Sequence, residues 1–372
     1  MEKYEYWLAS LNIKGLGSAG RRYLRKHFGS AKAVYEAHAD AVRKTEGLNE
    51  QVKEELISRR PSTEVLESRY QELRKKKIRM IPEYSNEYPQ RLKNLKNMPD
   101  ILYVRGRLPE ENRLTVSLVG SRHASSYGRK TARYFAKEMG LRGAQIISGM
   151  AYGIDSCAHE TALECGADTF AVMGCGIDIC YPAEKIALYE QIKQKGGIIS
   201  ELPLKAPPLP FQFPMRNRII AGLSDIVIVV EARERSGSLI TAGYALEQGR
   251  DVYIIPGRID DINSVGCNML WFDGAIPALS IDTILEGSIC KKMLNTDKEN
   301  FRDIKQNLKK DEYFGLDKTS DIVYSCLDLH MKSVEEIVKM TDRIPEEVMQ
   351  TLITMQLEGK IEEPVRGYYI KK

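Results

Sequence analysis

The chain has 372 residues, which is long enough for two or three domains that each bury a core. Its 43% hydrophobic and 28% charged residues are ordinary for a soluble globular protein. The net charge of +4 is modest, so any surface for nucleic acid must be a local concentration of charge. The seven cysteines form no CxxC pair, which indicates reduced thiols and no zinc site. Without a signal-peptide layout or a membrane-length apolar run, we expect a cytoplasmic protein.

Residues 1–80 are predicted to form a helical domain of the helix-hairpin-helix or SAM-like type. Leu11–Gly20 places two glycines in a tight turn between helices, and residues 45–56 are a weaker copy. In helix-hairpin-helix proteins, backbone amides at a helix start contact a phosphate. The segment from Ile13 to Tyr35 holds six Lys or Arg and no acid, although a glycine turn that only packs two helices is the alternative. The candidate accessory DNA contacts are Lys14, Arg21, Arg22 and Arg25.

Residues 81–290 are predicted to form the main domain. From about residue 114, short β-branched runs alternate with helical runs, which indicates a parallel sheet covered by helices on both faces. Ligands of such sheets bind beyond the carboxyl ends of the strands. The predicted strands are 115–119, 146–148, 169–173, 198–200, 226–230 and 251–255. The predicted helices are 126–141, 153–166, 184–195, 213–222 and 238–248.

Glycine and serine follow nearly every predicted strand, as in Gly120-Ser-Arg122 and Ser148-Gly149. Such residues just before a helix are typical of an anion held by backbone amides and hydroxyls. The fingerprints G-x-G-x-x-G after the first strand and G-x-x-x-x-G-K-[ST] are absent from the sequence. Their absence argues against an ordinary nicotinamide enzyme or ATPase.

The segment Phe211–Ser224 presents Arg216, Asn217 and Arg218 side by side before a strand with the pattern of burial on both faces. Arginine forks suit phosphate or carboxylate, and nearby phenylalanines suit the face of a base. The alternative is that the arginines pair with local acids. Arg218 is better placed for a structural role than Arg216, but the sequence does not separate them, and Asn217 either contacts a ligand or braces a loop.

No arrangement of nucleophile, base, paired acids or metal ligands is predicted, so we expect neither catalytic residues nor a bound metal. Arg122 follows a Gly-Ser turn, and anion binding is favoured over a structural salt bridge. Asp155 stands near a helix start, where a carboxylate stabilises the helix dipole. His159, one turn further on, is expected to be a core histidine rather than a base.

Residues 291–316 are predicted to be a polar linker, and residues 317–372 a winged-helix domain of three helices and a hairpin. The third helix of such a domain usually reads the major groove of DNA. Here residues 345–358 contain three glutamates and no Lys or Arg. Contact with a protein is therefore the favoured role of this domain.

The motifs together resemble the bacterial DNA processing protein A family, also called Smf. The close match covers about residues 85–285 and carries the specific motifs; the flanking regions fit three-domain members less specifically. The matching stretches are Gly120-Ser-Arg122, Ser148-Gly-x-Ala-x-Gly-Ile-Asp155, Ala158-His159, Gly176-x-Asp-x-x-Tyr-Pro182, Ser200-Glu201, Phe213-Pro-x-Arg-Asn-Arg-Ile-Ile-Ala-Gly-Leu-Ser224, Glu231-Ala232, Ser236-Gly-Ser-Leu-Ile-Thr-Ala242 and Pro256-Gly257.

The resemblance implies an extended Rossmann-like domain that binds single-stranded DNA, forms a homodimer and has no cofactor. It also implies that the protein protects incoming DNA and loads RecA onto it in natural transformation and recombination. The family tends to have Asn where this chain has Lys185, which makes Lys185 a candidate additional phosphate contact. The other DNA-binding residues that the resemblance implies are Ser121, Arg122, Phe213, Arg216, Asn217 and Arg218, with backbone access at Gly149, Gly237 and Ser238.

An enzyme is the main alternative. Nucleotide phosphoribohydrolases of the lysine-decarboxylase-like family resemble this fold and place glycine loops around a nucleoside monophosphate. Their motif Pro-Gly-Gly-x-Gly-Thr-x-x-Glu has its nearest counterpart at Ser236–Tyr244, which lacks the double glycine and has Tyr244 in place of the glutamate. A protein that senses a mononucleotide and signals to a partner is a third possibility.

Overall fold

The computed structural model describes residues 2–287, 318–328, 331–341 and 343–371. The chain divides into two compact units, Met1–Lys298 and Glu299–Lys372. The finer division into four segments stays a prediction, and the predicted linker 291–316 lies outside the described residues. In the described part of the chain, no helix is both long and apolar enough to cross a membrane.

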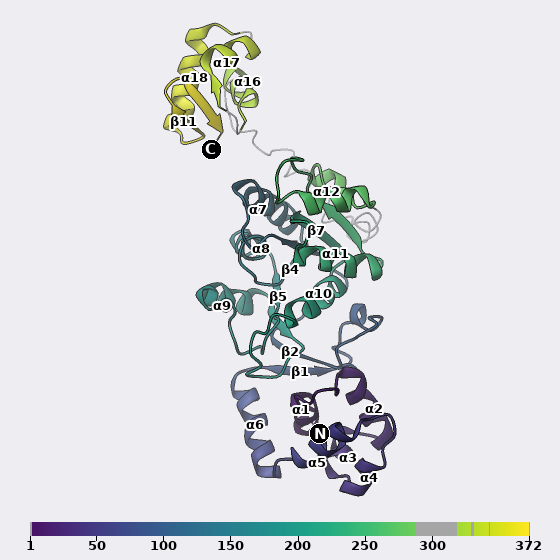
Figure 1. Cartoon of the computed structure of the whole chain (residues 1–372). Coiled ribbons are helices and arrows are strands. Elements are labelled where there is room, and N and C mark those ends of the chain that lie inside the picture. The colour runs from purple at the N-terminus through teal and green to yellow at the C-terminus, as the bar shows by residue number, and fades with distance from the viewer. Residues whose placement is uncertain (1, 288–317, 329–330, 342, 372) are drawn as a thin grey trace. The chain divides into compact units, whose positions relative to one another are not determined.

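A large, mostly parallel sheet organises the first unit (Figure 1). In spatial order the strands are β1 (Arg79–Pro82), β2 (Ile101–Gly106), β6 (Gly197–Ser200), β5 (Thr169–Val172), β4 (Gln145–Ser148), β3 (Thr115–Gly120), β7 (Ile226–Glu231), β8 (Asp251–Ile254) and β9 (Ile276–Pro277). Every strand from β6 to β9 in this spatial order runs parallel to its neighbours in that range. Strand β2 is antiparallel to β6, and β1 is antiparallel to β2. All six predicted strands are present, so the predicted parallel α/β core is confirmed.

Helices cover both faces of this sheet. Figure 1 shows α7, α8 and α9 on one side and α10 and α11 on the other. The five helices that we predict are all present, with ends shifted by only a few residues. The helices of this region are α7 (Ser126–Leu141), α8 (Ile154–Glu164), α9 (Ile186–Lys195), α10 (Gln212–Leu223), α11 (Gly237–Glu247), α12 (Val265–Phe272) and α13 (Ile281–Leu285), and the short 3-10 helices are η1 (Gln90–Leu92) and η2 (Ala183–Lys185).

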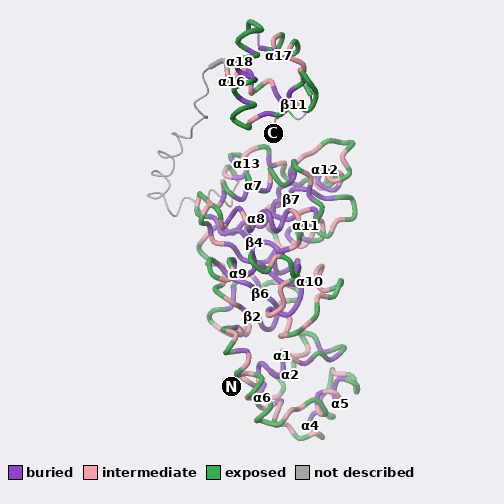
Figure 2. The backbone as a smooth tube through the Cα atoms, turned by 90° about the vertical axis from the view of Figure 1, so that its left-hand side faces the viewer, coloured by how far each residue is buried: buried purple, intermediate pink, exposed green. Residues whose placement is uncertain are grey.

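The central strands are apolar on both faces because each face buries a separate core. In β3, Val116 and Leu118 join the core under α7 and α8, whereas Val119 joins the core under α10 and α11. Neighbouring strand residues point to opposite faces of a sheet, which explains this division. Figure 2 shows the resulting concentration of buried residues around β4, β6 and β7.

The N-terminal helices pack into a core that is continuous with one end of the sheet. Trp7, Leu24 and Leu56 are buried in the same apolar cluster as Tyr103 of β2. The turn before α2 contains Gly15 with φ of 92°, a left-handed conformation that favours glycine. The helices are α1 (Glu2–Ser10), α2 (Ser18–Phe28), α3 (Ala31–Glu36), α4 (Ala39–Arg43), α5 (Glu50–Ser58) and α6 (Thr63–Lys75).

The second unit has a core of its own, which includes Val323, Leu352 and Tyr369. Ser333 and Glu336 form the predicted capping box: the Glu336 carboxylate accepts from the Ser333 N–H at 2.7 Å, and the Ser333 hydroxyl accepts from the Glu336 N–H at 3.2 Å. The helices are α16 (Lys318–Cys326), α17 (Val334–Thr341) and α18 (Pro345–Leu357), and the strands are β10 (Lys332–Ser333), β11 (Ile361–Val365) and β12 (Tyr368–Lys371).

Candidate nucleic-acid interface

Arg122 is an exposed cation at the carboxyl edge of the sheet. It follows β3, and its guanidinium lies 5.7 Å from the centroid of the Phe213 ring. Phe213 comes from the first turn of α10, and its ring lies 5.3 Å from that of Tyr181, which follows β5. No acidic partner of Arg122 is found among the described residues. A free guanidinium over an aromatic ring that itself packs against a second ring can bind a phosphate while a base stacks next to it.

A hollow of about 590 Å³ opens beside Arg122, between the starts of α7 and α8. Arg129 and Arg133 of α7 and Lys185 line it together with the exposed ring of Tyr152. The one acid in the lining, Glu160, accepts from Lys185 Nζ at 2.8 Å. Four cationic side chains against one carboxylate make the hollow electropositive, which favours an anionic ligand.

Arg216 does not reach the surface. It is 5% exposed, and its Nη1 donates to the carbonyl oxygen of Gly149 at 2.8 Å and to that of Val172. Burial lowers the pKa of Arg216 to about 10, with attraction from Asp155 acting in the opposite direction, so the side chain remains charged at neutral pH. Arg216 therefore joins the loop after β4 to the end of β5 from beneath the site.

Arg218 is held by an ion pair. Its Nη1 and Nη2 donate to the two carboxylate oxygens of Glu201 at 2.7 and 2.5 Å, and its Nε donates to the Asn97 carbonyl at 2.9 Å. Such a bidentate ion pair is the strong form of an arginine–carboxylate contact. The interpretation that arginines of this segment pair with a local acid therefore holds for Arg218.

Asn217 braces two helices rather than facing solvent. Its Nδ2 donates to the Gly237 carbonyl at the start of α11, at 3.1 Å, and its Oδ1 accepts from Arg216 Nε at 3.1 Å. Ser238 is buried next to it, and its N–H donates to the hydroxyl of Ser236, the N-cap of α11. The carboxamide thus fixes α10 against α11.

Two buried acids hold the loops of the site. Asp155 accepts from the N–H groups of Gly149 at 3.0 Å and Ala151 at 3.4 Å. Burial raises its pKa, whereas Arg216 and these two N–H groups act in the opposite direction. Glu231 at the end of β7 accepts from the Ser125 N–H at 3.0 Å, just before α7. Asp155 Oδ2 thus accepts from backbone N–H groups, and Glu231 accepts from both the N–H and the hydroxyl of Ser125. Both acids hold the backbone just before a helix, which agrees with a structural rather than a catalytic role for Asp155.

His159 is a core histidine, as the sequence predicts. Its Nδ1 lies 2.7 Å from Thr169 Oγ1, and the ring is fully buried. Burial and, to a lesser extent, Arg216 lower the pKa of His159 to about 3, so the imidazole is neutral at physiological pH.

The small residues predicted to bind DNA at the strand ends, Gly149, Gly237 and Ser121, have different surroundings. A Cβ at Gly149 would lie 2.5 Å from Arg216 Cζ, so this glycine makes room for the arginine. A Cβ at Gly237 would meet nothing within 4 Å. Ser121 is largely buried, and its hydroxyl accepts from the His123 N–H at 3.2 Å.

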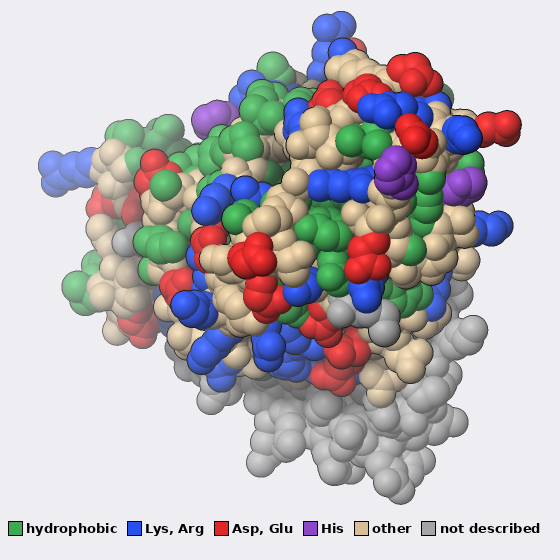
Figure 3. Space-filling view, turned by 90° about the horizontal axis from the view of Figure 1, so that it is seen from below, with side chains coloured by type: hydrophobic (Ala, Val, Ile, Leu, Met, Phe, Trp, Pro, Cys, Tyr) green, Lys and Arg blue, Asp and Glu red, His purple; other side chains and the backbone are tan. Residues whose placement is uncertain are grey.

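The basic residues of the N-terminal turn are mostly engaged in ion pairs. Arg21 pairs with Asp100 at 2.6 Å, and Arg25 is buried between Asp100 and Glu5. Arg22 pairs with Glu83 at 3.2 Å. Lys14 is exposed. Figure 3, which looks onto the N-terminal helices, shows Lys and Arg side chains interspersed with Asp and Glu rather than gathered in one basic patch.

Sequence reasoning missed four residues of this interface. Tyr181 and Tyr152 lie within the family motifs, but the prediction rests on the glycines and acids of those motifs. Arg129 and Arg133 lie on one side of a predicted helix, four residues apart. This spacing, next to a strand end that carries Arg122, is the signal that could have found them.

A parallel α/β sheet with exposed cations and aromatic rings beyond its strand ends defines a Rossmann-like protein with an anion-binding edge. The family model described as DNA recombination-mediator protein A matches residues 79–288. The chain therefore belongs to the DNA recombination-mediator protein A family, whose members include DNA processing protein A and Smf. This is a family of DNA-binding recombination mediators rather than enzymes, so the phosphoribohydrolase alternative is not supported.

Individual relatives agree with the family. Protein Smf of Synechocystis is 35% identical over 284 residues, which are 75% of this chain and 71% of that protein. Protein Smf of Escherichia coli is 43% identical over 208 residues, and the chain spans only 56% of its length. The structure of DNA processing protein A from Streptococcus pneumoniae has 33% identity and a TM-score of 0.65, over 77% of this chain and 97% of that chain.

A second similar solved structure concerns the binding of DNA by a relative. It is the structure of DNA processing protein A from Helicobacter pylori, and its subject is the single-stranded DNA binding mode of that protein. Its identity to this chain is 29% and its TM-score is 0.50, over 56% of this chain and 94% of that chain.

Proposed function

We propose that this protein binds single-stranded DNA at the edge formed by Arg122, Phe213 and Tyr181. The observation that carries the proposal is the exposed Arg122 guanidinium, which lies over the Phe213 ring and has no acidic partner among the described residues. The Helicobacter pylori relative, whose structure concerns single-stranded DNA, supports the same ligand. A single strand presents separate bases to aromatic rings, which a duplex does not.

Within this proposal the predicted DNA-binding residues divide into two groups. Arg122, Lys185 and the Phe213 ring contact the strand, and Gly237 leaves open space beside the start of α11. The buried residues of the prediction act by holding the loops in place and do not touch DNA. These positioning residues are Ser121, Gly149, Arg216, Asn217, Arg218 and Ser238.

Titration with labelled oligonucleotides tests the proposal. Wild-type protein is expected to bind a single strand more tightly than a duplex of the same length, and its affinity should fall with salt at a slope of about −0.7 per phosphate contacted. Arg122→Ala should weaken binding on the order of tenfold for every base sequence. Arg69→Ala on α6, which also removes an exposed arginine, is the control. Equal affinity of wild type and Arg122→Ala would contradict the proposal.

We infer further that the protein acts in recombination by protecting incoming single strands and loading RecA onto them during natural transformation. The support is membership of the recombination-mediator family. Strand exchange by RecA on single strands already coated with a single-strand-binding protein is the test. Addition of wild type should shorten the lag, and Arg122→Ala should not; a lag unchanged by wild type would refute RecA loading while leaving DNA binding intact.

A homodimer is part of the proposal. The segment 259–279 exposes large apolar side chains at the edge of the sheet, where β9 is the last strand: Ile259 is 95% exposed and Phe272 is 92% exposed. Large exposed apolar groups next to an unpaired strand edge favour association. Analytical ultracentrifugation should give a dimer for wild type and a monomer for Phe272→Glu. A wild-type monomer at all concentrations would contradict this part.

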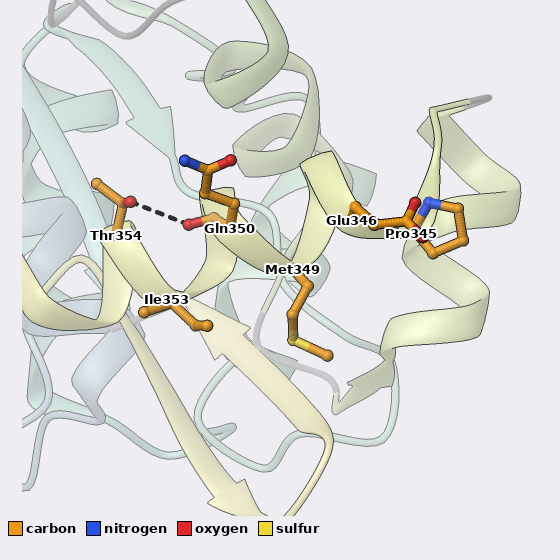
Figure 4. Close-up of a pocket in the computed structure, with 6 residues that line it drawn as sticks. All are labelled: Pro345, Glu346, Met349, Gln350, Ile353 and Thr354. Carbon is orange, nitrogen blue, oxygen red and sulfur yellow. Dashed lines mark hydrogen bonds between the residues drawn. The ribbon is translucent and has the colours of Figure 1, made fainter.

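For the C-terminal unit we propose a winged-helix domain that contacts a protein. Figure 4 shows Met349 and Ile353 on α18 along a shallow apolar hollow, with Glu346 at its end. Both apolar side chains are exposed, and α18 has no Lys or Arg. A phosphate backbone needs cations, so this surface suits a protein rather than DNA.

We also propose that the N-terminal helices form a helix-hairpin-helix domain. Lys14 is an exposed basic residue of its turn.

A further inference from the structure

Helix α7 carries an excess of positive charge that extends beyond the hollow at Arg122. It holds four cationic residues and a single acid, Glu138, whose carboxylate accepts from Arg142 just after the helix. The four cations are exposed, and no acidic partner of theirs is found in the described part of the chain. They are Arg129, Lys130, Arg133 and Lys137.

Three of these cations form a row. Arg129, Arg133 and Lys137 are spaced four residues apart, so they lie on one flank of the helix about 6 Å from one another along its axis. Arg129 and Arg133 line the same hollow as Arg122. The row therefore begins in the electropositive hollow and leads away from the sheet edge along α7.

The N-terminal end of α7 already has an acid beside it. The Glu231 carboxylate accepts from the N–H and the hydroxyl of Ser125, the N-cap of α7. Arg129 donates to the Ala124 carbonyl and stays exposed. The charge of the row that no acid offsets therefore lies further along the helix, at Arg133 and Lys137, where it favours an anionic ligand.

We propose that a single strand held at Arg122 continues along α7, with successive phosphates at Arg133 and Lys137; this rests on the proposed binding of single-stranded DNA. Lys185 contributes less to this path because Glu160 offsets its charge at 2.8 Å. The exposed Tyr152 ring across the hollow from α7 provides a stacking surface for a base of the same strand.

Oligonucleotides of two lengths test the extended path. The double variant Arg133→Ala/Lys137→Ala is titrated with single strands of about 4 and about 16 nucleotides. The short strand should bind as it binds wild type, because it occupies only the edge at Arg122. The long strand should bind on the order of tenfold more weakly, and its salt slope should become shallower by about 0.7 for each phosphate that the variant no longer binds. The control variant Arg69→Ala/Lys75→Ala on α6 removes the same net charge elsewhere, and its affinity for strands of either length should equal that of wild type.

The outcomes separate this inference from the proposed function. Unchanged binding of both lengths by the α7 variant, together with weakened binding by Arg122→Ala, would overturn the extended path alone. Equal losses for both lengths would also overturn it, because they would place the α7 cations in the primary edge. No effect of Arg122→Ala on either length would instead overturn the proposed edge itself. If the α6 control lost as much affinity for the long strand as the α7 variant, the loss would depend on net charge alone, and the path along α7 would be refuted.

Discussion

At the scale of single residues, burial separates arginines that look alike in the sequence. Arg216 and Arg218 stand two positions apart, yet the first bonds to backbone carbonyls beneath the site and the second to Glu201. Arg122, by contrast, is exposed and over an aromatic ring. The first two therefore support the edge, and the third is free to bind.

Arg218→Ala is expected to lower the free energy of unfolding by about 3 kcal/mol, because it leaves the largely buried Glu201 without its partner. Urea denaturation at neutral pH measures the change. Arg122→Ala is the matched control and should change the stability by less than about 0.5 kcal/mol, because its side chain is exposed. Similar stabilities of the two variants would show that the pair with Glu201 is not structural.

Gly149→Ala should lower the free energy of unfolding by about 1–3 kcal/mol, because the new methyl group would meet the Arg216 guanidinium carbon at 2.5 Å. Gly237→Ala, with open space around the added carbon, is the control. It should be neutral or slightly stabilising, since alanine favours a helix more than glycine does. Thermal denaturation of both variants compares them, and a tolerated Gly149→Ala would mean that Arg216 has room to move.

At the scale of elements, Asp100 fastens the N-terminal helices to the strand β2 that follows it. It is 1% exposed and accepts from both Arg21 and Arg25 of α2. Burial opposes its ionisation, but the hydrogen bonds and charges of the two arginines prevail and lower the pKa of Asp100 to about 2. The basic residues of the N-terminal turn thus hold two elements together, which leaves them less available to DNA.

This shift predicts a dependence of stability on pH. A carboxyl whose pKa is lower in the folded state stabilises the fold above its ordinary pKa and loses that contribution as the pH falls. The free energy of unfolding should therefore decrease by about 2 kcal/mol between pH 5 and pH 2 on account of Asp100. Urea titrations followed by the fluorescence of buried Trp7 measure it. In Asp100→Asn this part of the decrease should be absent; an identical pH profile would contradict the assignment.

At the scale of the whole molecule, DNA binding and protein contact are proposed for separate units of the chain. The cationic edge lies in Met1–Lys298, and the apolar surface of α18 lies in Glu299–Lys372. Each unit has its own core, so loss of one should leave the other folded.

Removal of residues 317–372 is expected to leave the affinity for single strands within about twofold of wild type, because α18 has no cation to offer a phosphate. Anisotropy titration at two salt concentrations measures it. A loss on the order of tenfold would show that the C-terminal unit contacts DNA. The double variant Met349→Glu/Ile353→Glu in the full chain is the matched control for the α18 surface and should bind DNA as wild type does.

The sequence by itself determined the parallel core, the succession of six of its strands and five of its helices along the chain, the capping box and the resemblance to the family. These properties follow from local sequence patterns that each span only a few residues. Examples are the apolar runs of β3 and β7 and the three-residue spacing of Ser333 and Glu336. Only the tertiary structure decided which cations are free. Arg218 pairs with Glu201, 17 positions away, and Arg21 pairs with Asp100, 79 positions away. An ion pair depends on which distant acid the fold brings within reach, and local periodicity carries no record of that.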